Sequence, residues 1–375
     1  MSSPDHPLVS PPRVWADVTL PHLRHNLRVA RQLQANCGMM AVLKAGAYGH
    51  GLSAVAQYLE TLPNAERPEF LGVASVIEAR ELTAAGIKTR IYLLGPTSPN
   101  ERAEVVQNRW TPCISSIEEA RHFDQLNRGG GALPVHIAVD TGMGRGGFLP
   151  ECLVSEFENL SAYQSLLLEG IGTHLPSADE DRAFTVEQIK NFDHLIDELG
   201  AERFKYRHVF NSAGLMAYSS QHANLCRPGL LLYGISPLKD QQSLLKPVMS
   251  LRSRVSLVRP LPSGHGISYG RDTVLEKATH VATIGVGYGD GFPKSASLKG
   301  VDAEIDNTPC PLLGRVTMDQ IMVDVSHLPH CQSGDQVELF GEINTVSDLA
   351  GKAGLIPWEI LTGITPRVVR NYIKD

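Results

Sequence analysis

The sequence has no long hydrophobic run and no excess of basic residues. Hydrophobic residues make up 42% of its 375 positions and charged residues 20%, a balance typical of globular proteins. Because the formal net charge is −6 and no basic block runs through the chain, a surface for nucleic acid or for an anionic membrane is excluded. No stretch is long and apolar enough to span a bilayer. We therefore expect no nucleic-acid partner, no membrane partner and a small-molecule substrate.

Paired cysteines and an export signal are absent as well. The six cysteines are scattered without a CxxC pair, which favours reduced thiols over a disulfide framework or a zinc site. Residues 1–12 are polar and rich in proline and serine, and they lack the basic start and apolar core of a signal peptide. We expect a flexible tail over residues 1–12, no bound metal and a cytoplasmic protein.

The pattern of apolar runs up to residue 240 predicts a parallel barrel. Short apolar runs alternate there with amphipathic stretches, which is typical of strands separated by helices. The expected strands are 39–43, 70–74, 90–94, 111–114, 134–139, 166–171, 206–210 and 224–226. Eight such units match a (β/α)8 barrel, which typically needs about 250 residues. The fold class is therefore an α/β barrel, with the barrel domain expected over 13–240.

A second domain with a different pattern is expected over 241–375. Its candidate strands follow one another with turn signals between them, which predicts a mostly antiparallel β domain. The clearest of these strands are 249–258, 280–286, 320–325 and 336–340. A strand over 15–20 precedes the barrel and is expected to join this β domain.

A lysine directly follows the first predicted barrel strand. Lys44 comes after the apolar residues 39–43 and before a glycine-rich turn, so it lies at the end of the barrel where active sites are found. An amine in a partly apolar pocket is disfavoured as ammonium, so its pKa falls and it can form a Schiff base with an aldehyde. This segment alone leaves open whether Lys44 only extends to solvent.

Four further loops with polar residues follow strands at the same barrel end. They are 140–145, 173–174, 211–214 and 227–229. The last two follow the seventh and eighth strands, where phosphate groups commonly bind in this fold. Ser212 at a predicted helix start and the backbone N–H groups of Gly229 and Leu230 therefore predict a phosphate site.

A lysine facing a phosphate site fits pyridoxal phosphate (PLP), whose aldehyde and phosphate lie on opposite sides of one ring. A Schiff-base aldolase acting on phosphorylated sugars would fit as well. Arg227 favours PLP, because an arginine at the ring nitrogen keeps its own proton and leaves the ring largely unprotonated. A weaker electron sink favours proton exchange at Cα over transamination. The alternative for Arg227 is an ordinary ion pair with a surface carboxylate.

Seven ordered motifs make the chain resemble the alanine racemases, the barrel-fold family of PLP-dependent racemases. They are AVLKAGAYGHG (41–51), DTGMGR (140–145), NSA (211–213), RPGLLLYG (227–234), ISYG (267–270), GYGDG (287–291) and GRVTMDQ (314–320). The resemblance runs from Trp15 to Ile373. It implies a cytoplasmic, homodimeric isomerase that interconverts L- and D-alanine and supplies D-alanine for peptidoglycan precursors.

The resemblance also implies roles for the site residues. Lys44 would bind PLP and act as the base for the D enantiomer, and Tyr269 would be the base for the L enantiomer. Two bases on opposite faces are needed, because one base returning its own proton gives retention. Tyr269 and the substrate-binding Met318 would reach the site of the other subunit in a head-to-tail homodimer. The remaining cofactor contacts would come from Tyr48, Ser212, Gly229 and Leu230 to the phosphate, Arg227 to the ring nitrogen, Arg145 to the phenolic oxygen and the substrate carboxylate, and His174 near the ring.

Three positions depart from the usual pattern of the family. Ala138 stands where many relatives have a carbamylated lysine that holds the arginine corresponding to Arg145, so Arg145 needs another anion or is held more loosely. Pro366 replaces a tyrosine at the entrance, and Lys294 replaces an arginine there. These changes leave a broader-specificity or serine racemase as an alternative. A non-catalytic PLP-binding regulatory barrel is a more distant one, because such barrels generally lack the second domain and therefore Tyr269.

Overall fold

The computed structural model describes residues 11–374, which form two compact units. The barrel unit comprises residues 20–248, and the β unit comprises residues 11–19 together with 249–374. Residues 1–10 of the expected flexible tail lie outside the described part. Within residues 11–374, no helix has the length and the apolar character needed to cross a membrane.

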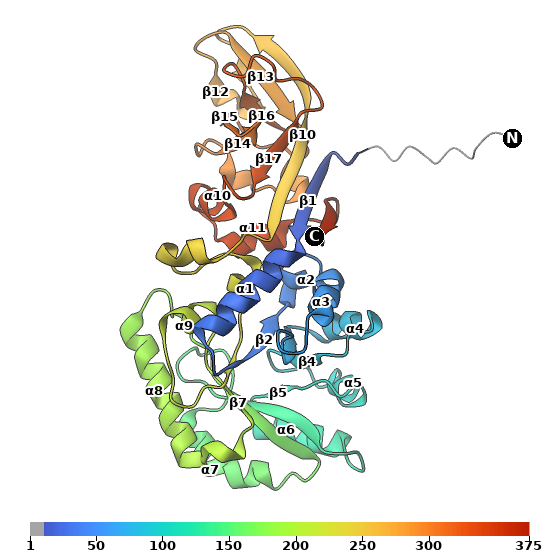
Figure 1. Cartoon of the computed structure of the whole chain (residues 1–375), viewed down its shortest axis with the longest axis vertical. Helices are drawn as coiled ribbons and strands as arrows, with labels where there is room; N and C mark the ends of the chain where they lie inside the picture. Colours follow the sequence, from blue (N-terminus) through green and yellow to red (C-terminus); the bar gives the residue numbers. More distant parts are fainter. Residues whose placement is uncertain (1–10, 375) are drawn as a thin grey trace, which may run out of the picture. The chain divides into compact units, whose positions relative to one another are not determined.

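The barrel unit contains a ring of parallel strands, as expected for the fold class (Figure 1). The strands are β2 (Gly38–Val42), β3 (Phe70–Val73), β4 (Arg90–Leu93), β5 (Cys113–Ile114), β6 (Leu133–Ala138), β7 (Leu166–Gly172), β8 (Tyr206–His208) and β9 (Leu225–Cys226). They form two sheets in the orders β4-β3-β2-β9 and β5-β6-β7-β8. A parallel bridge between Tyr92 and Thr111 joins the sheets on one side, and the N–H of Arg227 donates to the carbonyl of Phe210 on the other. The eight-stranded barrel predicted from the sequence is therefore confirmed.

The helices of the barrel unit are α1 (Leu20–Leu33), α2 (Lys44–Tyr48), α3 (Leu52–Thr61), α4 (Val76–Ala84), α5 (Arg102–Gln107), α6 (Ile117–Leu126), α7 (Pro150–Ser161), α8 (Arg182–Leu199) and α9 (Ser212–Ala217). Helix α1 precedes the first barrel strand and the other helices follow strands; α4, α6, α8 and α9 begin at capping side chains. Side-chain oxygens of Ser75, Asp181 and Asn211 accept backbone N–H groups at the starts of α4, α8 and α9. Such caps satisfy N–H groups that a helix start leaves without partners.

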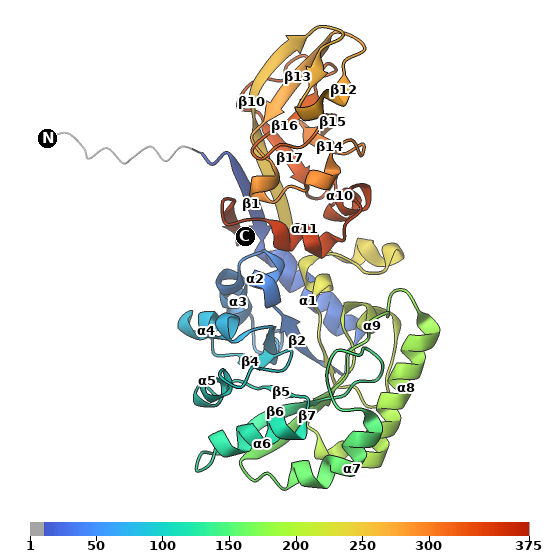
Figure 2. The ribbon, with the colours of Figure 1, turned by 180° about the vertical axis from the view of Figure 1, so that it is seen from behind.

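The β unit is built on an eight-stranded sheet in the order β13-β16-β15-β14-β17-β10-β1-β18 (Figure 2). Its strands are β1 (Val14–Thr19), β10 (Met249–Leu261), β13 (Thr279–Ile284), β14 (Asp302–Ile305), β15 (Thr308–Leu313), β16 (Ile321–Asp324), β17 (Gln336–Phe340) and β18 (Val369–Ile373), and the short pair β11 (Gly266–Ile267) and β12 (Thr273–Val274) lies apart from it. All pairs in the sheet are antiparallel except β1 with β18. β13 pairs with both β16 and β10, so this part of the sheet closes on itself. Helices α10 (Val346–Ala353) and α11 (Pro357–Gly363) belong to the same unit.

Candidate active site

Lys44 lies two residues after the end of β2, at the start of α2, and is followed by an unusual backbone turn. The next residues adopt the left-handed helical conformation, with φ/ψ of 56/50° at Ala45 and 56/52° at Ala47. Tyr48 also has a positive φ of 52°. Such angles cost about 1–2 kcal/mol for each residue with a side chain. Strained backbone of this kind clusters at functional sites, because the surrounding structure must hold it in place.

The carboxylate of Glu78 on α4 holds the start of this turn. Its Oε1 accepts the N–H of Ala45 at 2.6 Å, and its Oε2 accepts the N–H of Ala74 at 2.8 Å. Because Ala74 follows β3 and Ala45 follows Lys44, one side chain ties together the ends of two neighbouring strands. Glu78 was not predicted from the sequence, because it has no local signal beyond its place three residues after the cap Ser75.

The charges around Lys44 fit an amine that reacts in its neutral form. Burial lowers the pKa of Lys44, and the positive charges of Arg145 and Arg227 lower it further, while Glu78 opposes them. An amine with a lowered pKa has a larger neutral, nucleophilic fraction at neutral pH.

Tyr48, Ser212 and Gly229 come together close to the end of β2. Ser212 Oγ accepts the N–H groups of Gly229 at 3.0 Å and of Leu231 at 3.1 Å. A Cβ at position 229 would lie 2.6 Å from Tyr48 Oη, so the absence of a side chain is what lets the phenol approach this backbone. Burial raises the pKa of Tyr48 to about 12, which keeps its hydroxyl protonated and able to donate. Leu230, the next residue, begins the 3₁₀ turn η2 (Leu230–Tyr233).

Arg227 is buried and fixed by groups at the ends of β7 and β8. Its Nη1 donates to the carbonyl of His208 and contacts His208 Nδ1 at 2.7 Å, and its Nη2 donates to the carbonyl of Thr173 at 2.6 Å. None of its partners within residues 11–374 is a carboxylate, so the alternative of a surface ion pair is wrong. His174 Nδ1 lies 3.5 Å from Nη2, and burial and the charge of Arg227 lower the pKa of His174 to about 3.

Arg145 has less support than the other site residues. It ends a loop in which Asp140 accepts the N–H groups of Gly142, Met143 and Gly144. Arg145 itself is exposed and forms no hydrogen bond or ion pair with the described residues. Its charge nevertheless contributes to the lowered pKa of Lys44. The methyl group of Ala138, at the end of β6, can supply no anchor for it.

Tyr269 and Met318 belong to the β unit and are exposed. Tyr269 is 72% exposed at the start of the 3₁₀ turn η4 (Tyr269–Arg271), and Met318 is 52% exposed. The hydroxyl of Ser268, just before Tyr269, donates to the carbonyl of Arg315 at 2.7 Å. An aromatic ring and a thioether at this exposure offer apolar surface for contact with another molecule.

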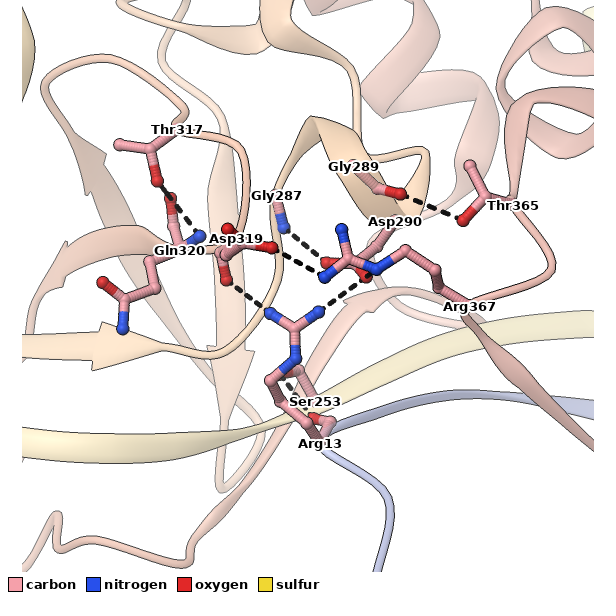
Figure 3. A network of polar contacts seen from close by, with 10 residues as sticks. All are labelled: Arg13, Ser253, Gly287, Gly289, Asp290, Thr317, Asp319, Gln320, Thr365 and Arg367. Carbon is pink, nitrogen blue, oxygen red and sulfur yellow. Dashed lines mark hydrogen bonds and ion pairs between the residues drawn. The ribbon is translucent and has the colours of Figure 1, made fainter.

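Figure 3 shows an ion-pair network around Asp290 that was not predicted from the sequence. The carboxylate of the fully buried Asp290 accepts a hydrogen bond from Arg13 Nη2 at 2.7 Å, and Arg367 Nε lies 3.4 Å from the same oxygen, Oδ1. Both arginines also donate to Asp319. Arg13 donates to the backbone carbonyl of Asp319 at 2.6 Å, and Arg367 donates to the carboxylate of Asp319 at 2.6 Å. The N–H of Gly289 donates to the carbonyl of Met318 at 2.9 Å. The network thus fixes the backbone that carries Met318.

Comparison with known proteins places both units in one family. The models of the alanine racemase N-terminal and C-terminal domains match residues 18–237 and 248–372. An alanine racemase from Methylacidiphilum infernorum (isolate V4) is 37% identical, with 96% of this chain and 93% of that protein covered. The structure of an alanine racemase from Clostridium difficile 630 has a TM-score of 0.89 at 34% identity, covering 97% and 96% of the two chains. One from Bartonella henselae with covalently bound pyridoxal phosphate has a TM-score of 0.88 at 27% identity, covering 97% of this chain and 100% of that one. The chain belongs to the alanine racemase family.

Proposed function

We propose that this protein interconverts L-alanine and D-alanine, with PLP as its cofactor. The observation that supports this most is the placement of Lys44, Ser212 and Arg227 at the ends of barrel strands around one mouth. A nucleophilic amine, a hydroxyl with adjacent backbone N–H groups and a fixed cation are the groups that PLP requires. Membership of the alanine racemase family supports the same conclusion.

The residues of the barrel unit fit the cofactor. Lys44 Nζ would bind its aldehyde carbon, and the guanidinium of Arg227 would face its ring nitrogen. Its phosphate would be held by Tyr48 Oη, Ser212 Oγ and the backbone N–H groups of Leu230 and Gly229, the last of which would exchange Ser212 Oγ for a phosphate oxygen. Bound PLP supplies an electron-withdrawing ring that makes the Cα proton of the amino acid acidic. Arg227 keeps its own proton and so leaves the ring nitrogen unprotonated, which limits side reactions such as transamination.

Two side chains would move the proton. Lys44 Nζ takes the Cα proton of D-alanine or returns one to form it. Tyr269 of the partner subunit does the same on the opposite face for L-alanine, so inversion follows when one base removes the proton and the other delivers a new one. Arg145 would orient the substrate carboxylate, and the exposed Met318 of the partner subunit would line the substrate site. His174 would lie beside Arg227 and the ring.

The proposed two-base mechanism implies how the protein assembles and where it acts. A head-to-tail homodimer would bring Tyr269 and Met318 to a second barrel unit, and their exposure on the β unit supports such a contact. The enzyme would act in the cytoplasm, where it would supply D-alanine for peptidoglycan precursors. Pro366 and Lys294 stand where the family resemblance implies an entrance tyrosine and arginine, and they favour a second candidate, a racemase that also accepts larger amino acids such as serine.

A substrate panel tests the proposal. The PLP-loaded protein is incubated with single L-amino acids, and the products are separated by chiral chromatography. Conversion of alanine alone is expected, whereas equal conversion of serine would favour the broader racemase. If no amino acid is converted although PLP binds, the catalytic proposal is rejected in favour of a PLP-binding regulatory barrel. Lys44→Ala should lose the cofactor's long-wavelength absorbance and all activity, while the exposed Lys88→Ala serves as the control.

A further inference from the structure

A column of polar side chains runs through the interior of the barrel unit, away from Arg227. Arg227 Nη1 lies 2.7 Å from His208 Nδ1, and His208 Nε2 lies 2.9 Å from His136 Nδ1. His136 Nε2 lies 4.0 Å from Glu169 Oε2, and Glu169 is ion-paired with Arg90 at the start of β4. The column therefore connects the barrel mouth to the opposite end of the strands.

The barrel is built to hold the two imidazoles. Both are buried, and both pack against glycines of the neighbouring strand β7. A Cβ at Gly170 would overlap the ring of His136, and a Cβ at Gly172 would overlap the ring of His208. The same two rings also contact Tyr92, with centroid distances of 5.0 and 5.8 Å.

The hydrogen bonds of the column can run in one direction only. The guanidinium of Arg227 has only donors, so His208 Nδ1 must accept. Burial lowers the pKa of His136 to about 3 and that of His208 well below its usual value, so both rings are neutral at neutral pH. A neutral ring with an accepting Nδ1 carries its proton on Nε2. His208 therefore donates to His136 Nδ1, and the proton of His136 lies on Nε2, toward Glu169.

We propose that His136 is a positioning residue for Arg227. By accepting the Nε2–H of His208, it fixes the one tautomer of His208 whose Nδ1 can accept from Arg227. Without that acceptor His208 is free to carry its proton on Nδ1, where it would face the N–H of Arg227 as a second donor and displace the guanidinium. The inference rests on the proposed function in one respect, namely that Arg227 faces the ring nitrogen of PLP.

Two substitutions separate hydrogen bonding from packing. His136→Asn places its Oδ1 where His136 Nδ1 lies and so keeps the acceptor, whereas His136→Leu has the same branched shape without one. We expect His136→Leu to raise the dissociation constant of PLP about tenfold, the change that loss of one buried hydrogen bond produces. The absorbance spectrum of its bound PLP should also change. His136→Asn should stay within about twofold of the wild type in affinity and should keep the wild-type spectrum.

The tautomer itself is read from ¹⁵N-histidine NMR of the protein without PLP. The His208 signal, assigned by its loss in His208→Gln, should report a proton on Nε2 in the wild type and in His136→Asn, and a population with the proton on Nδ1 in His136→Leu. If His136→Leu does not fold, His136→Phe provides the acceptor-free comparison. The proposal is overturned if a folded acceptor-free variant keeps the wild-type tautomer and PLP affinity, or if His136→Asn loses affinity as His136→Leu does. Neither the PLP titration nor the NMR measurement requires racemisation. An inactive wild-type protein would therefore refute the proposed racemase activity but not the role of His136.

Discussion

The environment of single side chains decides which groups of this protein can move a proton. Lys44 is half-buried near two arginines and one carboxylate, and the net effect lowers its pKa. Tyr269 lies on the other unit and is largely exposed. The two proposed bases thus lie in different environments, and in the proposed scheme Tyr269 would come from the partner subunit.

Removal of one hydroxyl tests the role of Tyr269. Tyr269→Phe should lower kcat for both directions at least about 100-fold, the lower bound typical of a lost general base, because Lys44 alone returns the proton to the face it left. PLP binding should not change. Rates are followed by chiral chromatography and binding by absorbance. Tyr163→Phe, a half-buried tyrosine of the barrel unit, is the matched control. Equal rates in wild type and Tyr269→Phe would contradict the two-base scheme.

Among the elements, the left-handed turn after β2 is a strained segment at the site. Its residues Ala45, Ala47 and Tyr48 all have positive φ. Tyr48 contacts the Gly229 backbone from within this turn, and Lys44 directly precedes it. The backbone conformation therefore sets the separation between the amine and the phosphate site.

Loss of the Glu78 carboxylate should loosen this turn. In Glu78→Gln one amide oxygen can still accept from Ala45, but the NH₂ group cannot accept from Ala74. We expect the free energy of unfolding to fall by about 1–2 kcal/mol, because one backbone N–H loses a charged acceptor. PLP affinity should fall as well. Urea unfolding and a PLP titration measure the two effects. Glu81→Gln, an exposed carboxylate on the same helix, should change neither, and equal behaviour of both variants would count against the role of Glu78.

Most barrel strands could be predicted from the sequence because they are short apolar runs buried on both faces and bounded by turn residues. β8 is an exception to this burial, since its Tyr206 and Arg207 are half-buried. β14 and β15 were not predicted. β15 contains Pro309 and Pro311, and proline is uncommon within strands. The left-handed turn was read as an ordinary glycine turn, because alanine and tyrosine rarely adopt a positive φ.

The candidate site likewise contains residues that could be predicted from the sequence and residues that could not. Lys44, Ser212 and Arg227 could be predicted as site residues because they follow predicted strands, and barrel geometry brings strand ends together. Asp290 and His136 were missed, since their partners lie far away in the sequence. His136 and His208 are 72 residues apart, and Arg13 and Asp290 are 277 apart. No local pattern encodes such contacts, although Asp290 lies within the GYGDG motif.

At the scale of the whole molecule, the buried histidines predict a pH dependence of stability. The pKa values of His136 and His174 are lowered to about 3, and that of His208 lies well below its usual value. The unfolded chain therefore binds protons below about pH 6.5 that the folded chain does not. Stability should therefore decrease as the pH falls from 7 to 5, by up to about 1.4 kcal/mol per pH unit for each histidine. Urea unfolding at pH 7, 6 and 5 measures this slope. It should be shallower in His136→Asn, and a flat profile would contradict the prediction.

The stability of the β unit should depend on Asp290. Asp290→Asn keeps the shape of the side chain but leaves Arg13 and Arg367 without their shared buried anion. We expect a loss of about 1–3 kcal/mol in the free energy of unfolding, reduced from the value for a fully buried pair because both arginines are partly exposed. Alanine turnover should fall too, since the Met318 segment loses its anchor. Asp306→Asn, in an exposed turn of the same unit, is the control, and an equal loss there would point to a general effect of charge.

The pairing of β1 has a consequence for the order in which the chain folds. The barrel unit is one continuous stretch, 20–248, whereas β1 lies between β10 and β18, which are made much later. During synthesis the barrel can form as soon as its own residues have emerged, because domains generally fold as units. β1 stays unpaired until both of its neighbouring strands, β10 and β18, have been synthesised. Completion of the β unit, and with it the presentation of Tyr269, is therefore expected to be the last step in the maturation of each chain.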